Sequence, residues 1–258
     1  MKAAQRKKKP ESYQKRTYRA QLDPGGLVST MVRVQETDLQ ILASTDITDR
    51  ARELILEARL QLENYIVKHP LFSATLDPLP MDLLAPPMVR RLLQAGLQAG
   101  VGPMAAVAGT IAEYVGEGLL ADGEPEIMVE NGGDIYLARQ QSCDVAIFAG
   151  RSSLSNKVGL RINARQMPLG ICTSSGTVGH SLSLGEADSV TVLARSAALA
   201  DAAATRLGNE VGKGDDEKSA VTKALEQAKT IDGLLGVVVI CGEAMGAIGD
   251  VELIRVAV

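Results

Sequence analysis

Two oxygen-bearing side chains, Asp201 and Thr205, stand four residues apart in a segment that holds six alanines between Ala197 and Ala204. Side chains at i and i+4 lie on the same face of a helix, so the carboxylate and the hydroxyl point to one place. Such oxygens suit a hard cation such as magnesium, with phosphate or water completing its shell. The pattern has an equally open structural interpretation, in which the aspartate accepts helix N–H bonds and the threonine bonds to its own backbone.

A second polar group, Asn131-Gly132-Gly133-Asp134, follows a strand that begins near Ile127. Paired glycines at the end of a strand permit positive φ or the close approach of a ligand to the backbone. Asp134 would then lie at the rim, where it could accept a hydrogen bond from a hydroxyl or a ring N–H. An ordinary tight turn of the Asn-Gly type explains the same residues without a ligand.

Together the two motifs resemble those of the ApbE-like superfamily, in which an NxGGD turn follows a small-residue helix and precedes an SVTV…ADAxAT strand and helix. Here the matching residues run from Gly100 to Gly208, with SVTV at 189–192 and ADAAAT at 200–205. The best-known members are flavin transferases, which cleave FAD with magnesium and attach FMN to a threonine or serine of a target protein. The resemblance therefore implies FAD and magnesium as cofactors and a protein acceptor as partner.

The resemblance also implies a role for individual residues. Asp201 and Thr205 correspond to the family's metal site, which a backbone carbonyl, placed on Ala108, completes. Asn131, Gly132, Gly133 and Asp134 correspond to the turn beside the flavin.

Two features depart from the family pattern. No lysine occurs between Lys68 and Lys157, although active transferases carry one just after the metal-binding alanine. The family's HxIDPxTG segment is replaced by residues 173–185, which keep Ser175, Gly176 and a histidine, His180. The resemblance places this loop beside the flavin, with Ser175 and Gly176 as binding residues. His180 is then the candidate general base for an attacking hydroxyl, or else a loop histidine bonded to its polar neighbours.

Composition excludes several classes of protein. With 258 residues and 46% hydrophobic content, the chain is long enough to bury a substantial core. A net charge of −4 gives no case for nucleic-acid binding. Three scattered cysteines and two histidines argue against a zinc site and fit a reducing cytoplasm. The standard P-loop, dinucleotide-binding and serine-hydrolase spacings are absent.

The N-terminus is basic, with eight lysines and arginines among residues 1–19. No apolar segment of signal-peptide type follows them, and no run of 18 apolar residues occurs in the chain. We expect a flexible basic tail over residues 1–17, a single domain over 18–258, no membrane contact and a cytoplasmic location.

Alternating helical and strand patterns predict an α+β fold with helices packed on a mainly antiparallel sheet. The resemblance sharpens this to T-fold-like layers of duplicated β-α-β-β units. Strands are expected at 18–22, 28–42 (a hairpin), 127–129, 135–138, 145–149, 158–162, 189–193, 237–241 and 251–256, the last two forming a C-terminal hairpin. Helices are expected from about 48 to Lys68 and at 88–99, 104–120, 195–207 and 219–229.

These inferences predict a protein that binds a flavin nucleotide. Two reactions are open to it as an enzyme: cleavage of the FAD pyrophosphate with transfer of FMN, and simple hydrolysis of that pyrophosphate. The alternatives are a non-catalytic binder of flavin or another nucleotide, and a structural protein that shares only the fold. The alanine-rich faces and the C-terminal hairpin suit a homodimer and a packed core equally well.

Overall fold

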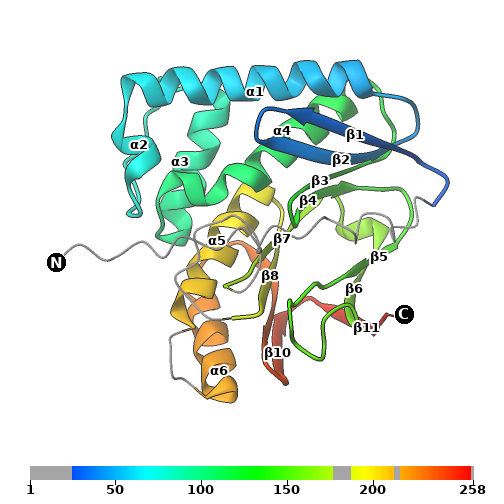
Figure 1. Ribbon diagram of the computed structural model, residues 1–258, viewed down its shortest axis with the longest axis vertical. Coiled ribbons are helices and arrows are strands. Elements are labelled where there is room, and N and C mark those ends of the chain that lie inside the picture. The colour runs from blue at the N-terminus through cyan, green and yellow to red at the C-terminus, as the bar shows by residue number, and fades with distance from the viewer. Residues whose placement is uncertain (1–24, 177–186, 212–215, 257–258) are drawn as a thin grey trace.

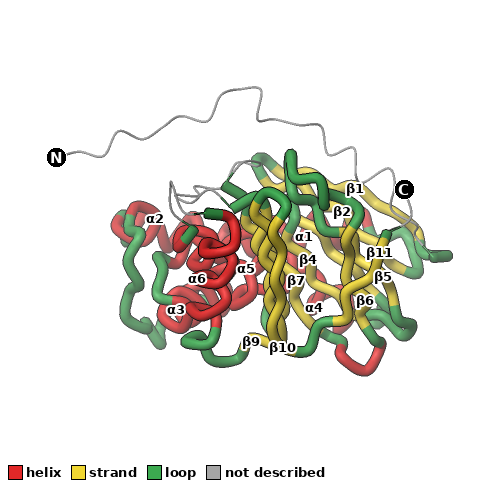
Figure 2. The backbone as a smooth tube through the Cα atoms, turned by 90° about the horizontal axis from the view of Figure 1, so that it is seen from below, coloured by secondary structure: helices red, strands yellow, loops and turns green. Residues whose placement is uncertain are grey.

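The chain folds as helices on one face of a large antiparallel sheet, with a smaller sheet on the other face (Figures 1 and 2). The computed structural model describes residues 25–176, 187–211 and 216–256. The predicted tail, the predicted strand at 18–22 and His180 lie outside these residues. Within the described part, eight strands form the large sheet in the order β1-β2-β3-β4-β7-β8-β9-β10, and three form the small one in the order β11-β6-β5. The predicted α+β arrangement is confirmed.

The elements have the following bounds. The large sheet comprises β1 (Val28–Val34), β2 (Thr37–Ala43), β3 (Ile127–Asn131), β4 (Asp134–Ala138), β7 (Leu169–Ser174), β8 (Ser189–Ala194), β9 (Leu234–Cys241) and β10 (Ala244–Gly249). The small sheet comprises β5 (Cys143–Ala146), β6 (Val158–Ile162) and β11 (Glu252–Arg255). The helices are α1 (Thr48–Lys68), α2 (Leu71–Ala74), α3 (Pro87–Ala99), α4 (Val107–Ala121), α5 (Ala197–Glu210) and α6 (Glu217–Ala228), with short 3-10 turns η3 (Pro103–Ala106) and η4 (Ala164–Gln166).

The large sheet has an apolar core on each face. Successive strand residues point to opposite faces, so Ile41 of β2 packs under the helices while Leu42 packs toward the small sheet. The same alternation places Val129 and Met128 of β3 in different cores. Central strands such as β8 and β9 are therefore buried on both sides, and β9 reads as a nearly continuous apolar run.

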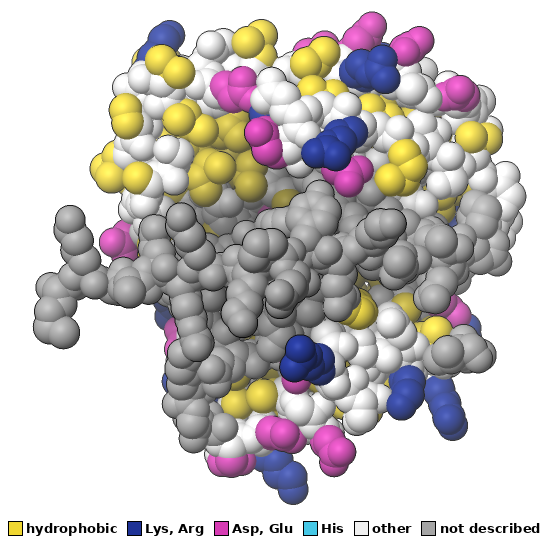
Figure 3. Space-filling view, in the orientation of Figure 1, with side chains coloured by type: hydrophobic (Ala, Val, Ile, Leu, Met, Phe, Trp, Pro, Cys, Tyr) yellow, Lys and Arg dark blue, Asp and Glu magenta, His cyan; other side chains and the backbone are white. Residues whose placement is uncertain are grey.

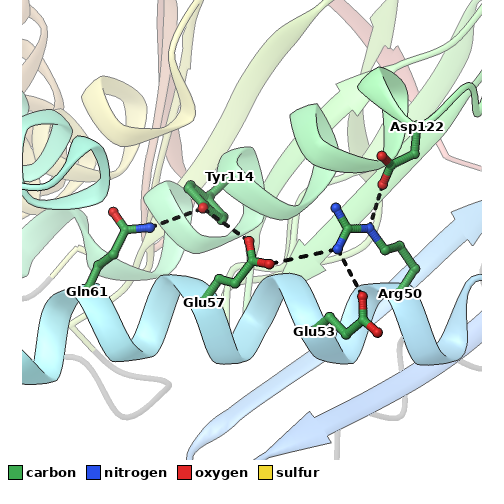
Figure 4. A network of polar contacts seen from close by, with 6 residues as sticks. All are labelled: Arg50, Glu53, Glu57, Gln61, Tyr114 and Asp122. Atoms are coloured by element: carbon green, nitrogen blue, oxygen red, sulfur yellow. Dashed lines mark hydrogen bonds and ion pairs between the residues drawn. The ribbon is translucent and has the colours of Figure 1, made fainter.

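Polar contacts fasten α1, the outermost helix in Figure 1, to α4. Figure 4 shows Arg50 bonded to Asp122 of α4 at 2.6 Å and to Glu53 of its own helix at 3.0 Å. Tyr114 of α4 lies 3.5 Å from Glu57 and accepts a hydrogen bond from Gln61 at 3.1 Å. These contacts fix which face of α1 packs against α4.

Two strands differ from the sequence prediction. β7 was not predicted, and it lies at the centre of the large sheet between β4 and β8. The predicted C-terminal hairpin is wrong in its second strand, because β9 turns at Gly242, with φ 59°, directly into β10. β11, from the predicted 251–256 segment, instead pairs with β6 in the small sheet.

No single helix in the described part of the chain is long and apolar enough to cross a membrane. Residues Pro87–Ala99 and Pro103–Ala121 meet the length and composition criteria only as a pair, which is bent by 104°.

Candidate functional site

Polar side chains meet at one edge of the large sheet, where the β3–β4 turn, the end of β7 and the start of β8 lie together. The first turn of α4 and the middle of α5 cover this edge on the helix side. The residues predicted from the two sequence motifs are brought together here.

Asp201 of α5 holds the first turn of α4. Its Oδ2 accepts a hydrogen bond from the Gly109 N–H at 2.8 Å, and the side chain is buried. Asp201 therefore accepts a helix N–H bond, as its structural interpretation predicts, but the helix that it caps is α4 and not its own helix α5. The Ala108 N–H also bonds to this carboxylate, and each carboxylate oxygen has two lone pairs, so Asp201 keeps acceptor capacity for a ligand.

Thr205 lies one turn further along α5, and its hydroxyl is 3.5 Å from the carbonyl oxygen of Ala105. The Ala108 carbonyl accepts a hydrogen bond from the Asn131 side-chain amide at 3.1 Å. The carbonyl that Thr205 contacts is that of Ala105, and the metal-ligand role of the Ala108 carbonyl stays a prediction. Asn131 was predicted to bind the cofactor, and here its amide holds the start of α4 against β3.

Asp134 is the first residue of β4 and pairs in register with Cys172 of β7. Burial raises the pKa of Asp134 well above its usual range, and the Asp201 carboxylate raises it further. Contacts with the Cys172 thiol and the Thr173 backbone act in the opposite direction. The pKa of Asp201 is also raised by burial, against the lowering effect of the Gly109 and Ala108 N–H groups.

The electrostatics of this pair favour a cation. The two carboxylates are buried, and the charge of Asp201 raises the pKa of Asp134, so the pair carries an uncompensated negative charge when both ionise. The described residues contain no cluster of three His, Cys, Asp or Glu side chains that could hold a metal. The donor set is instead made of carboxylate, hydroxyl and carbonyl oxygens, which suits a hard divalent cation rather than zinc.

The glycine turn has the geometry that its sequence predicts. Gly132 and Gly133 have φ of 71° and 114°, and they connect Asn131 and Asp134 as the two residues of a hairpin turn. The Gly133 N–H donates to Oε1 of Glu130 at 3.0 Å. The tight-turn interpretation is confirmed, and binding of a flavin by this turn stays a prediction.

The two described ends of the connection between β7 and β8 lie at the same edge. Gly176 donates its N–H to the Ala187 carbonyl at 2.9 Å, which joins the two ends of the loop. Ser174, at the end of β7, lies against Gly208 of α5. Ser175 and Gly176 are therefore next to the site, while His180 falls in the part of the loop that is not described.

Sequence reasoning missed Glu113 of α4, whose side chain is buried. Its Oε2 accepts hydrogen bonds from the Ser196 hydroxyl at 2.9 Å and from the Ala198 N–H at 3.0 Å. Asp201 of α5 caps α4, and Glu113 of α4 caps α5, so the two helices cap each other. The sequence signal for this contact was the position of Glu113, one turn after Gly109 and so on the same face of α4, the face that meets α5.

The fold is that of the ApbE flavin transferases. The apo flavinyl transferase ApbE of Pseudomonas stutzeri superposes with a TM-score of 0.55 over 86% of this chain and 93% of that one, at 14% identity. The ApbE protein of Thermotoga maritima gives a TM-score of 0.52 over 85% and 96% of the two chains, at 15% identity.

Sequence comparison identifies the family. The family described as "AbpE bacteria" matches residues 19–253, and the chain belongs to it. A UPF0280 protein of Methanococcus maripaludis is 46% identical over 209 residues, 80% of this chain and 83% of that protein. A UPF0280 protein of Methanosarcina acetivorans is 45% identical over 206 residues, 80% of this chain and 80% of that protein. A UPF0280 protein of Methanocaldococcus jannaschii is 43% identical over 209 residues, 80% of this chain and 84% of that protein.

Proposed function

We propose that the edge site binds a flavin nucleotide together with a divalent cation, and that the protein transfers FMN from FAD to a threonine or serine of a target protein. The observation that carries the proposal is the buried pair Asp134 and Asp201, set beside Thr205 and the Ala105 carbonyl at a glycine turn. This donor set lies in the fold of a flavinyl transferase.

Each residue has a distinct part in the proposal. Asp201, Thr205 and the Ala105 carbonyl would hold magnesium, which neutralises phosphate charge and activates the phosphorus toward attack. Asp134 keeps the site negative and orders the end of β4. Gly132 and Gly133 lack a Cβ, so their backbone can approach the flavin closely.

Transfer also needs a base for the acceptor hydroxyl. His180 is the sequence's candidate, since an imidazole can accept a proton near neutral pH. Ser175 and Gly176, at the described end of the same loop, are proposed to line the flavin.

A second candidate function is binding without transfer. The resemblance places the family's lysine just after Ala108, where this chain has Gly109 and Thr110, which offer no positive charge to the pyrophosphate. The same oxygen ligands and glycine turn would still hold a nucleotide and its cation. A flavin carrier or sensor of this kind would bind FAD and leave it intact.

The two functions separate in one experiment. The purified protein is incubated with FAD and magnesium, with or without EDTA, and bound FAD, released AMP and FMN are measured. With no target protein in the mixture, water takes the place of the acceptor hydroxyl, so cleavage releases AMP and FMN together. We expect this metal-dependent release in the wild type, its loss in Asp201→Asn and Thr205→Val, and wild-type behaviour in Asp232→Asn, an exposed aspartate on the loop after α6. Tight binding with intact FAD supports the second candidate, and no binding of FAD with or without magnesium contradicts both.

A further inference from the structure

The outermost helix, α1, exposes a stripe of large apolar side chains. Leu56, Leu60 and Val67 are 50%, 62% and 79% exposed. Their spacing of four and seven residues places them on one face of the helix. Single exposed apolar residues are common on protein surfaces, whereas aligned ones mark a contact with another molecule.

The stripe turns away from the rest of the molecule. The inward face of α1 buries Ala51, Leu54, Ile55, Ala58 and Leu62. A second face carries the contacts with α4 that Figure 4 shows. In Figure 1 α1 runs along the outer border of the molecule, and the exposed fractions of Leu56, Leu60 and Val67 show that at least half of each side chain is uncovered.

Charged and polar residues border the stripe in a self-complementary order. On one border stand Arg52, 54% exposed, and Glu63, 49% exposed. On the other stand Glu53 and Asn64. Arg52 lies 3.9 Å from Asp49 in an ion pair, and Glu63 pairs with Arg59 of its own helix at 2.7 Å. The pair with Arg59 uses one carboxylate oxygen of Glu63, so the second oxygen can meet Arg52 of a second copy.

Apart from Val67, whose equivalent position is Asp49, these residues are symmetric about one point, near residue 58. Leu56 and Leu60 lie at equal distances from it along the helix, and so do Arg52 and Glu63, and Glu53 and Asn64, to within one residue. In an antiparallel helix pair, residues on the same border of the stripe face each other across the two-fold axis. A second copy of the helix would therefore place opposite charges, and matching leucines, in contact.

We propose that α1 packs antiparallel against α1 of a second copy of this chain to form a homodimer. Leu56 would contact Leu60 of the partner subunit, and Arg52 would pair with Glu63 of the partner subunit. Such an interface is isologous, the same patch on both subunits. Antiparallel packing also opposes the two helix dipoles favourably.

The size of this interface sets the expected affinity. The stretch from Asp49 to Lys68 is about 30 Å long at 1.5 Å per residue. One helix pair of that length buries less than the roughly 1,600 Å² of a standard stable interface. We therefore expect a dimer that dissociates in the micromolar range.

A charge-exchange experiment tests this geometry. Arg52→Glu creates a like-charged pair with Glu63 of a second copy, and Glu63→Arg creates a like-charged pair with Arg52. Each variant alone should therefore self-associate at least tenfold more weakly than the wild type. When the two variants are mixed, both charge pairs are opposite again, so they should form a one-to-one heterodimer, which native mass spectrometry resolves by mass.

An apolar substitution gives a second readout. Leu60→Glu should leave the protein monomeric in sedimentation velocity, while Leu97→Glu, at a 43% exposed leucine of α3, should not change the dimer. Circular dichroism verifies that each variant is folded. A wild type that stays monomeric at about 10⁻⁴ M, well above the expected dissociation constant, would overturn the proposal. The stripe would then be a contact for another protein or for a lipid surface. A dimer that survives Leu60→Glu would overturn the proposal as well.

Discussion

One oxygen of Asp201 accepts a hydrogen bond from Gly109 at 2.8 Å, and the same side chain lies beside the buried carboxylate of Asp134. The hydrogen bond stabilises the fold, whereas the second negative charge opposes it. A cation would reconcile the two effects by compensating the charge of both carboxylates. At the residue scale, therefore, a structural cap and a metal ligand are compatible functions of one aspartate.

Asp201→Asn separates these two functions. The amide oxygen of asparagine can still accept the bond from Gly109, and the repulsion of Asp134 is gone. We expect the metal-free variant to be as stable as the wild type or more stable, by up to about 1 kcal/mol. Magnesium should raise the melting temperature of the wild type, as a ligand that binds only the folded state does, and leave that of the variant unchanged. Thermal unfolding with EDTA and with magnesium measures both effects, and a variant that still responds to magnesium would contradict the ligand role.

Glu113 gives a pH-dependent prediction. Burial raises its pKa from the ordinary 4.5, against the opposing bonds from Ala198 and Ser196. A raised pKa means that the folded state holds the proton more tightly, so this group's contribution to stability falls as pH rises from about 4.5 through the raised value. Glu113→Gln cannot ionise, and we expect its free energy of unfolding to fall less over that range.

Urea unfolding of the wild type and Glu113→Gln from pH 4.5 to 8 checks this slope. Glu113→Ala serves as the comparison, because it removes the cap of α5 as well as the charge. Relative to Glu113→Gln, it should cost about 1–2 kcal/mol at every pH, because neither variant ionises at this position. Equal slopes for the wild type and the glutamine variant would show that Glu113 does not titrate in this range.

At the scale of elements, local sequence patterns identified most helices and strands but not their partners. β6 was predicted at its observed bounds because its apolar residues alternate clearly. β10 was missed because Ala244–Gly249 is rich in glycine and alanine. The glycine at position 246 is explained by the packing of α6. A Cβ there would lie 2.7 Å from Val221 of α6, so this close contact requires a residue that has low strand propensity.

In the candidate site, too, local features could be predicted from the sequence and contacts between distant segments could not. The i, i+4 spacing of Asp201 and Thr205 and the glycine turn are local, so they could be predicted. The meeting of Asp134 with Asp201 depends on the pairing of β4 with β7 and on the packing of α5 over both. No local pattern encodes such contacts between distant segments, and β7 itself was not predicted.

Gly109→Ala tests how closely α4 and α5 must approach. A Cβ at Gly109 would contact the Ala197 carbonyl and lie 2.8 Å from Cβ of Asp201. Because the first of these is backbone, α5 would have to move, at a cost of about 1–3 kcal/mol. We expect reduced stability in urea and loss of the magnesium response.

Gly118→Ala is the matched control on the same helix. A Cβ there meets only the Leu54 side chain, at 2.7 Å, which has rotamers available to it. The control should lose less stability and keep its response to magnesium. Loss of the response in both variants would mean that general destabilisation, rather than displacement of Asp201, is responsible.

At the scale of the whole molecule, the large sheet separates two cores. The site lies on the helix side, and the small sheet packs on the other side around Leu42, Leu137 and Leu160. Seen from below in Figure 2, the helices and the small sheet lie on opposite sides of the large sheet. Stability lost on the small-sheet side should therefore reach the site only weakly, since separate sites are energetically nearly additive.

Leu160→Ala tests this separation. Leu160 is fully buried between the sheets, so its truncation should cost about 2–5 kcal/mol. The paired residue on β11, Leu253, is 38% exposed, and Leu253→Ala should cost much less. Both variants should show the same rise in melting temperature with magnesium as the wild type, because neither touches α4 or α5. If Leu160→Ala lowered the melting temperature and also abolished the magnesium response, the two cores would unfold as one unit with the site, and the small sheet would have to be counted among the elements that position Asp134.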